Sequence, residues 1–376
     1  MSKKANNEGN IRLRKDNRWE ARITLGNGKR KSYFAKTREE AHAKLLQGQQ
    51  SLALGVDLSG DNIKFTEFST EWLEAKRPNV EVKTFRTYSD LLSKHILPVF
   101  SKLPLNKIKV RDVESLYQGL TKKGLSPTSV GHIASVLYNI FALAVKWELV
   151  ISNPCEYADR PKLKKHTPII WSEEQVGTFL STTTGSPFEA LFDVLVASMC
   201  RINEALALCW SDIDFKENKI SITKNLKLDE NGRLISGSTK TDNSNRVITV
   251  PQRVIDKLAQ HRLSQMKHYQ SLEGYGDKKL VFASKLGTFL SHQNIDKRIF
   301  KPLLKEAGLN VKTRLHDLRH IGASICLKNA VPVTTVSEFL GHSSPAVTMN
   351  IYSHSIPKSE KILVGVMDKV MEIKVV

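Results

Sequence analysis

Residues 316–325 have the sequence HDLRHIGASI, and this short stretch says more about fold and chemistry than any other part of the chain. At 100° per residue, its apolar side chains fall on one side of a helix. Two imidazoles and a guanidinium gather on the other side: His316, Arg319 and His320. The pattern fits either a solvent-facing polar edge or a cationic site for an anion. Zinc is a weaker alternative, because the histidines lack the glutamate of HExxH and the intervening arginine would repel a cation.

A second stretch, residues 198–208 (SMCRINEALAL), places a charged pair beside an apolar stripe. Arg201 and Glu204 are i, i+3 neighbours near the expected start of a helix. An unpaired charge among so many apolar residues is costly, so the arginine needs a partner. One interpretation is a local ion pair with no other role. The other is that Glu204 orients a guanidinium whose remaining donors face an anion.

A third stretch, residues 339–352 (FLGHSSPAVTMNIY), predicts two short helices with a tight corner between them. Gly341 suits the end of the first helix, and Ser344 suits the residue that caps the second. His342 would then be held in the corner, and Tyr352 would lie at the far end of the second helix. Taken alone, such a tyrosine is more often a packed aromatic residue than a nucleophile.

These stretches, in this order, resemble the tyrosine recombinase (phage-type integrase) family. The family pattern is an arginine with a following acidic residue, a hairpin lysine, HxxR, a histidine or tryptophan after Leu-Gly, and a tyrosine further on. The residues that match it here are Arg201, Glu204, Lys240, His316, Arg319, His342 and Tyr352. One departure is Met199, where many members have glycine, and this departure puts the geometry of the local turn in question.

The resemblance implies a site-specific DNA recombinase, or integrase, that cuts DNA through a protein nucleophile. The phosphate is anionic, so Arg201 and Arg319 would bind its oxygens and stabilise the pentacoordinate transition state. The phenol of Tyr352 would attack phosphorus and form a 3′-phosphotyrosine, leaving a free 5′ hydroxyl. This covalent link preserves the bond energy, so a second DNA end can reverse the reaction without ATP.

Three further residues have roles implied by the same resemblance. A phenol is mostly neutral at pH 7, so a base must accept its proton, and His316 is the expected acceptor. His342 would hydrogen-bond the phosphate, and Lys240 would give the departing 5′ oxygen its proton. We expect no cofactor and no metal, and the sequence contains neither a P-loop motif nor a carboxylate cluster with magnesium spacing.

Length and composition narrow the class of protein. The chain has 376 residues, 40% of them hydrophobic, with 57 Lys+Arg against 38 Asp+Glu and a net charge of +19. This predicts two or three domains, excludes wholesale disorder and favours nucleic acid as partner over a basic surface kept for solubility. No run approaches the ~18 apolar residues of a membrane span, and the N-terminus does not resemble a secretory signal. Four scattered cysteines fit a reduced intracellular compartment. The resemblance implies that this compartment is the bacterial cytoplasm, with its nucleoid.

The first 48 residues carry 13 Lys/Arg against 5 Asp/Glu and alternate as strands do. Strands over 18–25 and 30–35 flank a hairpin turn, and residues 9–15 would add a third strand. A capped helix over 37–47 completes a small sheet whose cationic face would lie in a DNA groove, unless it is an ordinary β-hairpin extension. The predicted DNA-binding residues are Arg18, Arg22, Lys29, Arg30 and Lys31, with Lys83 and Arg86 in the helical segment that follows.

The remaining patterns predict a multidomain, mainly α protein with small β elements. Residues 64–150 predict a helical bundle in which Pro98 ends the first long run, and residues 152–168 predict a linker. The last part mixes helices with strands at 219–223, 233–240 and 246–250, the latter two joined by a hairpin turn at 242–245. The expected domains are an arm-type DNA-binding domain (1–55), a helical core-binding domain (60–155) and a mixed α+β catalytic domain with a tail helix (165–376).

The resemblance also implies partners and an assembly. Four subunits would act on double-stranded DNA at core and arm attachment sites and exchange strands through a Holliday junction. Bending and directionality factors from the host or the element are possible further partners. We expect no association with a membrane. The apolar stripe of residues 359–376 would dock on a neighbouring subunit or on its own domain.

Two other function classes compete with recombination. A type IB-like topoisomerase would use the same arginine, lysine, histidine and tyrosine chemistry to relax supercoils. A catalytically dead DNA-binding regulator would keep the fold without the reaction. The basic N-terminal segment favours recombination over relaxation, and the complete set of matching residues argues against decay.

Overall fold

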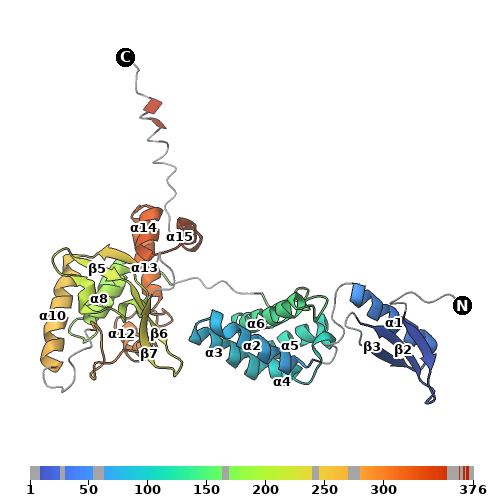
Figure 1. Ribbon diagram of the computed structural model, residues 1–376. Coiled ribbons are helices and arrows are strands. Elements are labelled where there is room, and N and C mark those ends of the chain that lie inside the picture. The colour runs from blue at the N-terminus through green and yellow to red at the C-terminus, as the bar shows by residue number, and fades with distance from the viewer. Residues whose placement is uncertain are drawn as a thin grey trace. The chain divides into compact units, whose positions relative to one another are not determined.

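The computed structural model describes residues 9–25, 30–53, 63–162, 169–238, 245–269 and 280–353, with five tail residues: Val364, Met367, Asp368, Val370 and Met371 (Figure 1). The chain divides into two compact units, residues 1–165 and 166–376. As the sequence predicts, the protein is mainly helical with small sheets, including a three-stranded sheet near the N-terminus.

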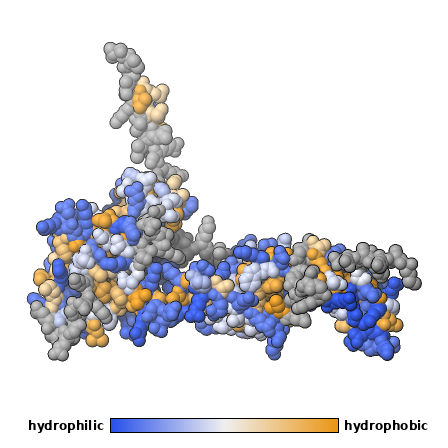
Figure 2. Space-filling view, viewed as in Figure 1, coloured by the Kyte–Doolittle hydropathy of each residue, from blue (hydrophilic) through white to orange (hydrophobic). Residues whose placement is uncertain are grey.

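The N-terminal sheet follows the predicted alternation. Its antiparallel strands run in the order β1 (Asn10–Leu13), β2 (Trp19–Thr24) and β3 (Arg30–Ala35), and helix α1 (Arg38–Ala53) follows. Ala21 and Ile23 are buried in a small core with Leu45 of α1, because strand residues two apart share a face. The opposite face is charged, and Figure 2 shows hydrophilic side chains gathered over this sheet.

The helices of residues 63–162 surround a second apolar core in the first unit. They are α2 (Phe65–Lys76), α3 (Val82–Leu91), α4 (Leu97–Phe100), α5 (Val110–Lys122) and α6 (Pro127–Lys146), with short 3-10 turns at Arg77–Asn79 and Leu105–Lys107. Ser126 caps α6, since its hydroxyl accepts a hydrogen bond from the Ser129 N–H at 3.1 Å. Among the described helices, α6 alone is long and apolar enough to cross a membrane by length and composition. Its apolar side chains fill the bundle core instead, Ile133 and Leu137 being fully buried.

The prediction that Pro98 ends its helix is wrong. Residues Leu92–Ile96 form a wider π-helical turn (η3), in which the Leu97 N–H bonds the Leu92 carbonyl, and the helix continues as α4. Proline lacks the N–H of the ordinary ladder, and the wider turn accommodates that loss without a break. The same arrangement recurs in the second unit, where the π turn η7 (Asp296–Phe300) precedes the proline of α12 (Lys301–Glu306).

The predicted linker begins later than expected. Cys155 and Ala158 are buried against the bundle core, and the Asn153 side chain donates to the Tyr138 carbonyl at 3.1 Å. The first part of residues 152–168 therefore packs on the bundle, whereas residues 163–168 lie outside the described part.

The second unit packs helices around a core that includes a cluster of phenylalanines. Phe179, Phe192 and Phe300 have ring centroids 5.2–6.0 Å apart. The described helices, apart from α12, are α7 (Glu173–Thr182), α8 (Glu189–Ser198), α9 (Ile202–Ala205), α10 (Gln252–Tyr269), α11 (His292–Ile295), α13 (Asp317–Lys328), α14 (Val333–Leu340) and α15 (Pro345–Tyr352).

The strands of this unit pair differently from the prediction. Strand β5 (Lys219–Ile222) lies between β4 (Ile213–Asp214) and β8 (Arg246–Thr249), and β6 (Lys224–Leu228) pairs with β7 (Leu234–Ser238). The expected hairpin between 233–240 and 246–250 is therefore wrong, because each strand pairs with an earlier one. Its turn residues 242–244 lie outside the described part.

Candidate active site

Helix α13 packs against α8 and α14, which brings three distant segments of the chain together (Figure 1). Arg319, in its first turn, is only 4% exposed, and its two Nη groups donate to the carbonyls of Met199 (2.8 Å) and Leu340 (2.7 Å). The guanidinium thus ties the ends of α8 and α14 to each other. Burial and the nearby charge of Arg201 lower the pKa of Arg319 to about 10, so it remains a cation at neutral pH.

This position differs from the prediction for the 316–325 helix. The sequence pattern placed Arg319 on an open polar side with the two histidines, but the structure buries it among backbone carbonyls. A guanidinium has five N–H donors, and two of them bond these carbonyls. The planar group therefore keeps further donors in a fixed orientation.

The Arg201–Glu204 pair is real, and it has a third member. Glu204 is 2% exposed and accepts from Arg201 Nη1 at 2.7 Å, from the Arg201 backbone N–H at 2.9 Å and from Arg246 Nη2 at 3.0 Å. Burial alone would raise the pKa of Glu204, but Arg246 and Arg201 hold it below its usual value. The carboxylate therefore stays ionised and fixes both arginines.

The two arginines differ in how open they are. Arg246 is 7% exposed and also donates through Nε to the Phe339 carbonyl at 2.8 Å, whereas the Arg201 side chain is 40% exposed. Arg201 is thus the solvent-facing cation of the cluster, and Arg246 braces its partner. The sequence analysis did not single out Arg246.

The turn before Arg201 explains the departure at Met199. Met199 ends α8 with φ 48° and ψ 24°, in the left-handed region that glycine adopts at little cost. The family's preference for glycine here thus has a conformational reason. Room for the methionine side chain comes from Gly322, because a Cβ at that position would lie 2.6 Å from Met199 Cγ.

Two predicted histidines flank the buried arginine. His316 directly precedes α13, and its side chain is exposed. Partial desolvation by the surrounding protein lowers the pKa of His316, and so do the charges of Arg319 and Arg201. His342 lies in the corner between α14 and α15, as predicted, with Nδ1 2.7 Å from Thr348 Oγ1. Burial and the same two arginines lower the pKa of His342 to about 4, so its ring is neutral at pH 7.

The corner itself has the predicted form. Gly341 closes α14 with φ 67° and ψ 45°, and Ser344 precedes Pro345 at the start of α15. Tyr352 ends α15 with 1% exposure, in an apolar cluster that includes Met199 and Leu340. Burial raises the pKa of Tyr352 to about 12, although the charge of Arg319 opposes the shift. The phenol therefore keeps its proton in this state.

The hydroxyl of Tyr352 has a partner that the predicted catalytic set does not include. His320 Nδ1 lies 2.8 Å from Tyr352 Oη, and the two ring centroids are 5.6 Å apart. The sequence pattern placed His320 beside His316, and their rings are indeed 5.3 Å apart and nearly perpendicular. The sequence pattern did not show that His320 contacts Tyr352, because the two residues lie 32 positions apart.

The last member of the predicted set, Lys240, lies outside the described residues. It falls in the segment that joins β7 to β8, and β8 begins with Arg246 of the glutamate cluster. The structure therefore brings Arg201, Glu204 and Arg319 into one neighbourhood with the histidines and Tyr352, and it leaves the place of Lys240 open. Among the described residues, no group of three or more His, Cys, Asp or Glu could hold a metal ion.

The predicted DNA-binding residues of the N-terminal sheet divide between its two faces. Arg22 and Arg30 belong to the open face, on which Arg22 Nε donates to Glu20 at 2.8 Å. Lys31 pairs with Ile23 and so belongs to the face covered by α1, and its contact with DNA stays a prediction. Lys29 lies outside the described residues.

Arg18 and the two candidates in the bundle complete the predicted set. Arg18 bonds Asp16 at 2.8 Å and lies over the Phe34 ring at 5.7 Å from its centroid. Lys83 and Arg86 lie on α3, the first exposed and the second partly buried. Their contact with DNA stays a prediction.

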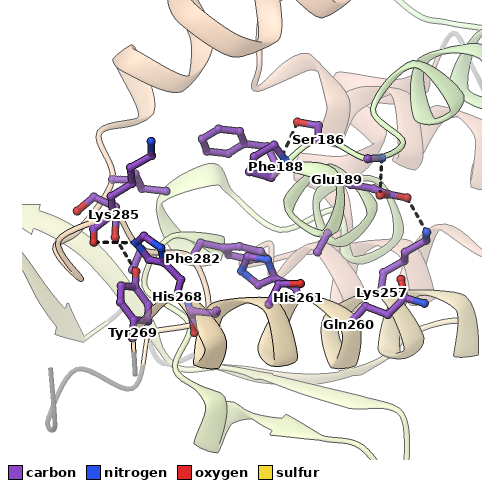
Figure 3. Close-up of a pocket in the computed structure, with 18 residues that line it drawn as sticks. Ser186, Phe188, Glu189, Lys257, Gln260, His261, His268, Tyr269, Phe282 and Lys285 are labelled. Carbon is purple, nitrogen blue, oxygen red and sulfur yellow. Dashed lines mark hydrogen bonds and ion pairs between the residues drawn. The ribbon is translucent and has the colours of Figure 1, made fainter. Parts of the chain in front are cut away.

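A separate concavity of about 740 Å³ lies between the start of α8, α10 and residues 282–290 (Figure 3). Its polar contacts include the Glu189–Lys257 ion pair at 2.7 Å and a hydrogen bond from Tyr269 to the Ser284 carbonyl at 2.6 Å. None of the predicted catalytic residues lines it. The candidate active site is therefore the arginine-rich neighbourhood of Tyr352 and not this cavity.

Comparison with known proteins identifies the family. Residues 172–358 match the phage integrase family, and residues 64–121 match the phage integrase N-terminal SAM-like domain. A tyrosine recombinase XerC-like protein of Caldanaerobacter subterraneus is 29% identical over 363 residues, covering 90% of this chain and 92% of the relative. The ICEBs1 integrase of Bacillus subtilis is 28% identical and covers 75% of this chain and 76% of its own length.

A solved structure shares the fold. The Tn1549 transposon integrase in complex with circular-intermediate DNA has a TM-score of 0.69 at 18% identity, covering 82% of this chain and 99% of that chain. The family matches thus define a DNA strand-cleaving and rejoining enzyme. The chain belongs to the phage integrase family of tyrosine recombinases, the site-specific recombinases of phages and other mobile elements.

Proposed function

We propose that this integrase cleaves double-stranded DNA with Tyr352 as nucleophile, in a pocket where Arg201 and Arg319 bind the scissile phosphate. One observation carries the proposal. The buried Arg319 bonds the Met199 carbonyl, two residues from Arg201, and the Leu340 carbonyl, which leads into α15 and Tyr352. A single guanidinium thus connects the three segments that supply the cations and the phenol.

The reaction follows from the chemistry of these groups. Tyr352 Oη forms a bond to phosphorus as the bond from phosphorus to the 5′ oxygen breaks, which yields a 3′-phosphotyrosine and a 5′ hydroxyl. His316 accepts the phenolic proton, and Lys240 gives a proton to the departing oxygen. Its lowered pKa keeps His316 neutral at pH 7, as a proton acceptor must be.

The arginines act mainly on the transition state. Charge builds up on the non-bridging oxygens as the fifth bond forms, and oriented guanidinium donors stabilise it. Glu204 keeps Arg201 in place before DNA arrives, so little reorganisation is needed during the reaction. His342, held by Thr348, donates a further hydrogen bond to the phosphate.

The other parts of the chain would hold the DNA. Residues 1–55 form an arm-type DNA-binding domain, residues 60–155 a core-binding domain and residues 165–376 the catalytic domain. The integrase works in the bacterial cytoplasm, on the nucleoid, as a homotetramer that passes through a Holliday junction, with bending and directionality factors as further partners. A DNA complex of the similar Tn1549 integrase supports DNA as the partner.

Tail docking on a neighbouring subunit belongs to the same proposal. Deleting residues 359–376 should leave binding to a single site intact and weaken recombination, because the tail would couple each catalytic domain to its neighbour. Unchanged recombination by the truncated protein would contradict this role.

A nicked suicide substrate tests the nucleophile. The nick lets the fragment that bears the 5′ hydroxyl diffuse away, so the covalent adduct accumulates and is seen as a band of retarded mobility. Wild-type protein should form the adduct with or without EDTA, and Tyr352→Phe should not. An adduct that persists in Tyr352→Phe would show that another residue attacks. Relaxation of supercoiled plasmid without an attachment site would instead favour a topoisomerase.

A further inference from the structure

The hydroxyl of Tyr352 is held by one polar side chain in a largely apolar setting. Among the described residues, the hydrogen bond that this hydroxyl makes is with His320 Nδ1, at 2.8 Å. The ring of Tyr352 packs in the apolar cluster that includes Ala323 and Val336. Apolar contacts fix the ring but not the direction of its O–H bond, so only a polar partner can set that direction.

The protonation states of the pair determine the direction of the hydrogen bond. Burial and the neighbouring His316 lower the pKa of His320 to about 4, so its imidazole is neutral at pH 7. Burial raises the pKa of Tyr352 to about 12, so the phenol remains protonated. The phenol therefore donates to Nδ1, and the His320 tautomer carries its proton on Nε2.

The neighbours of His320 explain why it cannot readily become a cation. His320 follows Arg319 directly in α13, and the titratable groups that face it are those of Arg319, Arg314, Asp317 and His316. The two arginines oppose a further positive charge, and Asp317 is already bonded to Arg314 at 2.8 Å. A neutral hydrogen-bond acceptor is the role that these surroundings leave to the ring.

We infer that His320 is a positioning residue for the nucleophile: its Nδ1 holds the Oη of Tyr352 and sets the approach of that oxygen to the phosphate. The inference rests on the proposed function of Tyr352. It assigns no proton transfer to His320: Nδ1 holds the O–H before attack, and the O–H turns to His316, which takes the proton as Oη bonds to phosphorus. Misplacement of a reacting atom by about 1 Å costs about 100-fold in rate, so a single hydrogen bond of this kind matters.

Three variants separate positioning from other roles. His320→Ala removes the acceptor, His320→Asn places an amide oxygen near the position of Nδ1, and His268→Ala is a matched control. His268 is an exposed histidine of α10 that bonds the Lys285 carbonyl, in the separate concavity. The rate of adduct formation on the suicide substrate is measured in a single turnover, together with DNA affinity and the melting temperature.

We expect His320→Ala to lower the rate of adduct formation about 10- to 100-fold with DNA affinity within about twofold of wild type. His320→Asn should recover most of that loss, because it accepts the hydrogen bond without being able to take a proton. His268→Ala should match the wild type. A melting temperature of His320→Asn near that of the wild type would exclude misfolding as the cause of any remaining loss.

Two results would overturn the inference. If His320→Ala cleaves as fast as wild type, the hydrogen bond has no role in positioning. If His320→Asn is folded but no faster than His320→Ala, something other than an acceptor near Nδ1 is required. Tyr352→Phe distinguishes these outcomes from failure of the proposed function, since an adduct formed by Tyr352→Phe would show that another residue is the nucleophile.

Discussion

The N-terminal sheet and the catalytic unit each contain a glutamate held between two arginines, and the two clusters differ in what the arginines can do. Glu20 accepts from Arg12 and Arg22 at 2.8 Å, and Glu204 accepts from Arg201 at 2.7 Å. Both carboxylates are 2% exposed. The two clusters differ in how far their arginines are exposed to solvent.

On the sheet, both arginines remain open. The side chain of Arg12 is 52% exposed and that of Arg22 is 36% exposed, and Ser32 adds a further hydrogen bond to the carboxylate of Glu20. The arginines themselves cover this glutamate, so it lies on a surface and not in a core. Such a cluster exposes two guanidinium groups and suits an extended contact with a phosphate backbone.

In the catalytic unit, one arginine is closed off. Arg246 is 7% exposed and bonds a backbone carbonyl, so Arg201 is the member of the cluster that faces solvent. A fixed single cation suits one phosphate that must be placed to a fraction of an ångström. The ion pairs therefore leave two exposed arginines on the sheet but only one in the catalytic unit.

Glu204→Gln should give the largest effect. The amide would turn a donor toward one of two arginines, and removing one partner of a buried ion pair costs about 3–5 kcal/mol. We expect adduct formation on the suicide substrate to fall at least about 100-fold, with a lower melting temperature for the full chain. Glu20→Gln is the matched substitution on the sheet.

We expect Glu20→Gln to cleave the suicide substrate at the wild-type rate, because Arg12 and Arg22 are not part of the proposed active site. Equal loss of cleavage in both variants would contradict the distinction between the clusters. Cleavage by Glu204→Gln at wild-type rate would show that Arg201 needs no fixed partner.

Gly322→Ala should give the second-largest effect, since it tests whether the catalytic cluster depends on core packing. The added Cβ would meet Met199 Cγ at 2.6 Å and the Val196 carbonyl at 3.2 Å. Overpacking of this kind costs about 1–3 kcal/mol, so the melting temperature should fall and cleavage should slow. The carbonyl of Met199 holds Arg319, which links the packing to the site.

Adding Met199→Gly to Gly322→Ala should restore part of the loss. Glycine adopts the left-handed conformation of residue 199 without strain and removes the side chain that clashes. Strict additivity of the two substitutions in the melting temperature would mean that the two residues are not coupled.

Local patterns predicted the parts of this site that depend on neighbouring residues. Helical spacing placed Arg319 beside the histidines, the Gly341 turn placed His342 in a corner, and Arg201 was correctly paired with Glu204 three residues away. Arg246 was not found, because its partner Glu204 is 42 residues away and no local pattern joins them.

Errors in the sheets have the same cause. The Asp242–Asn245 turn signal is local and suggested a hairpin, but β8 pairs with β5 over a longer distance. Strict alternation from Ile23 across the hairpin places Lys31 on the covered face and Arg30 on the open one, and the DNA-binding residues were predicted without that step. The burial of Arg319 required the carbonyls of two other helices, which no single helix pattern contains.

Arg22→Ala and Lys31→Ala, matched substitutions on opposite faces of the sheet, should give a smaller effect that tests the open face. We expect Arg22→Ala to weaken binding of arm-site DNA about 5- to 10-fold and to reduce the slope of log affinity against log salt by about one. Lys31→Ala should change neither, because Lys31 is on the face covered by α1 and its ammonium lies over the Tyr33 ring at 5.6 Å. Equal losses in both variants would contradict the assignment of faces.

The smallest effect concerns pH. Hydrogen bonds from Arg22, Ser32 and Arg12 lower the pKa of Glu20 to about 2. A depressed carboxyl pKa contributes stability that is present above the ordinary value, near 4.5, and lost as pH falls toward 2. Arm-site DNA binding should therefore be unchanged by the titration of Glu20 between pH 7 and pH 4.5, and Glu20→Gln should show the same profile in that window. A loss of binding between pH 6 and pH 4.5 that Glu20→Gln abolishes would mean that the carboxylate is protonated there, so that the two arginines do not hold it as the structure indicates.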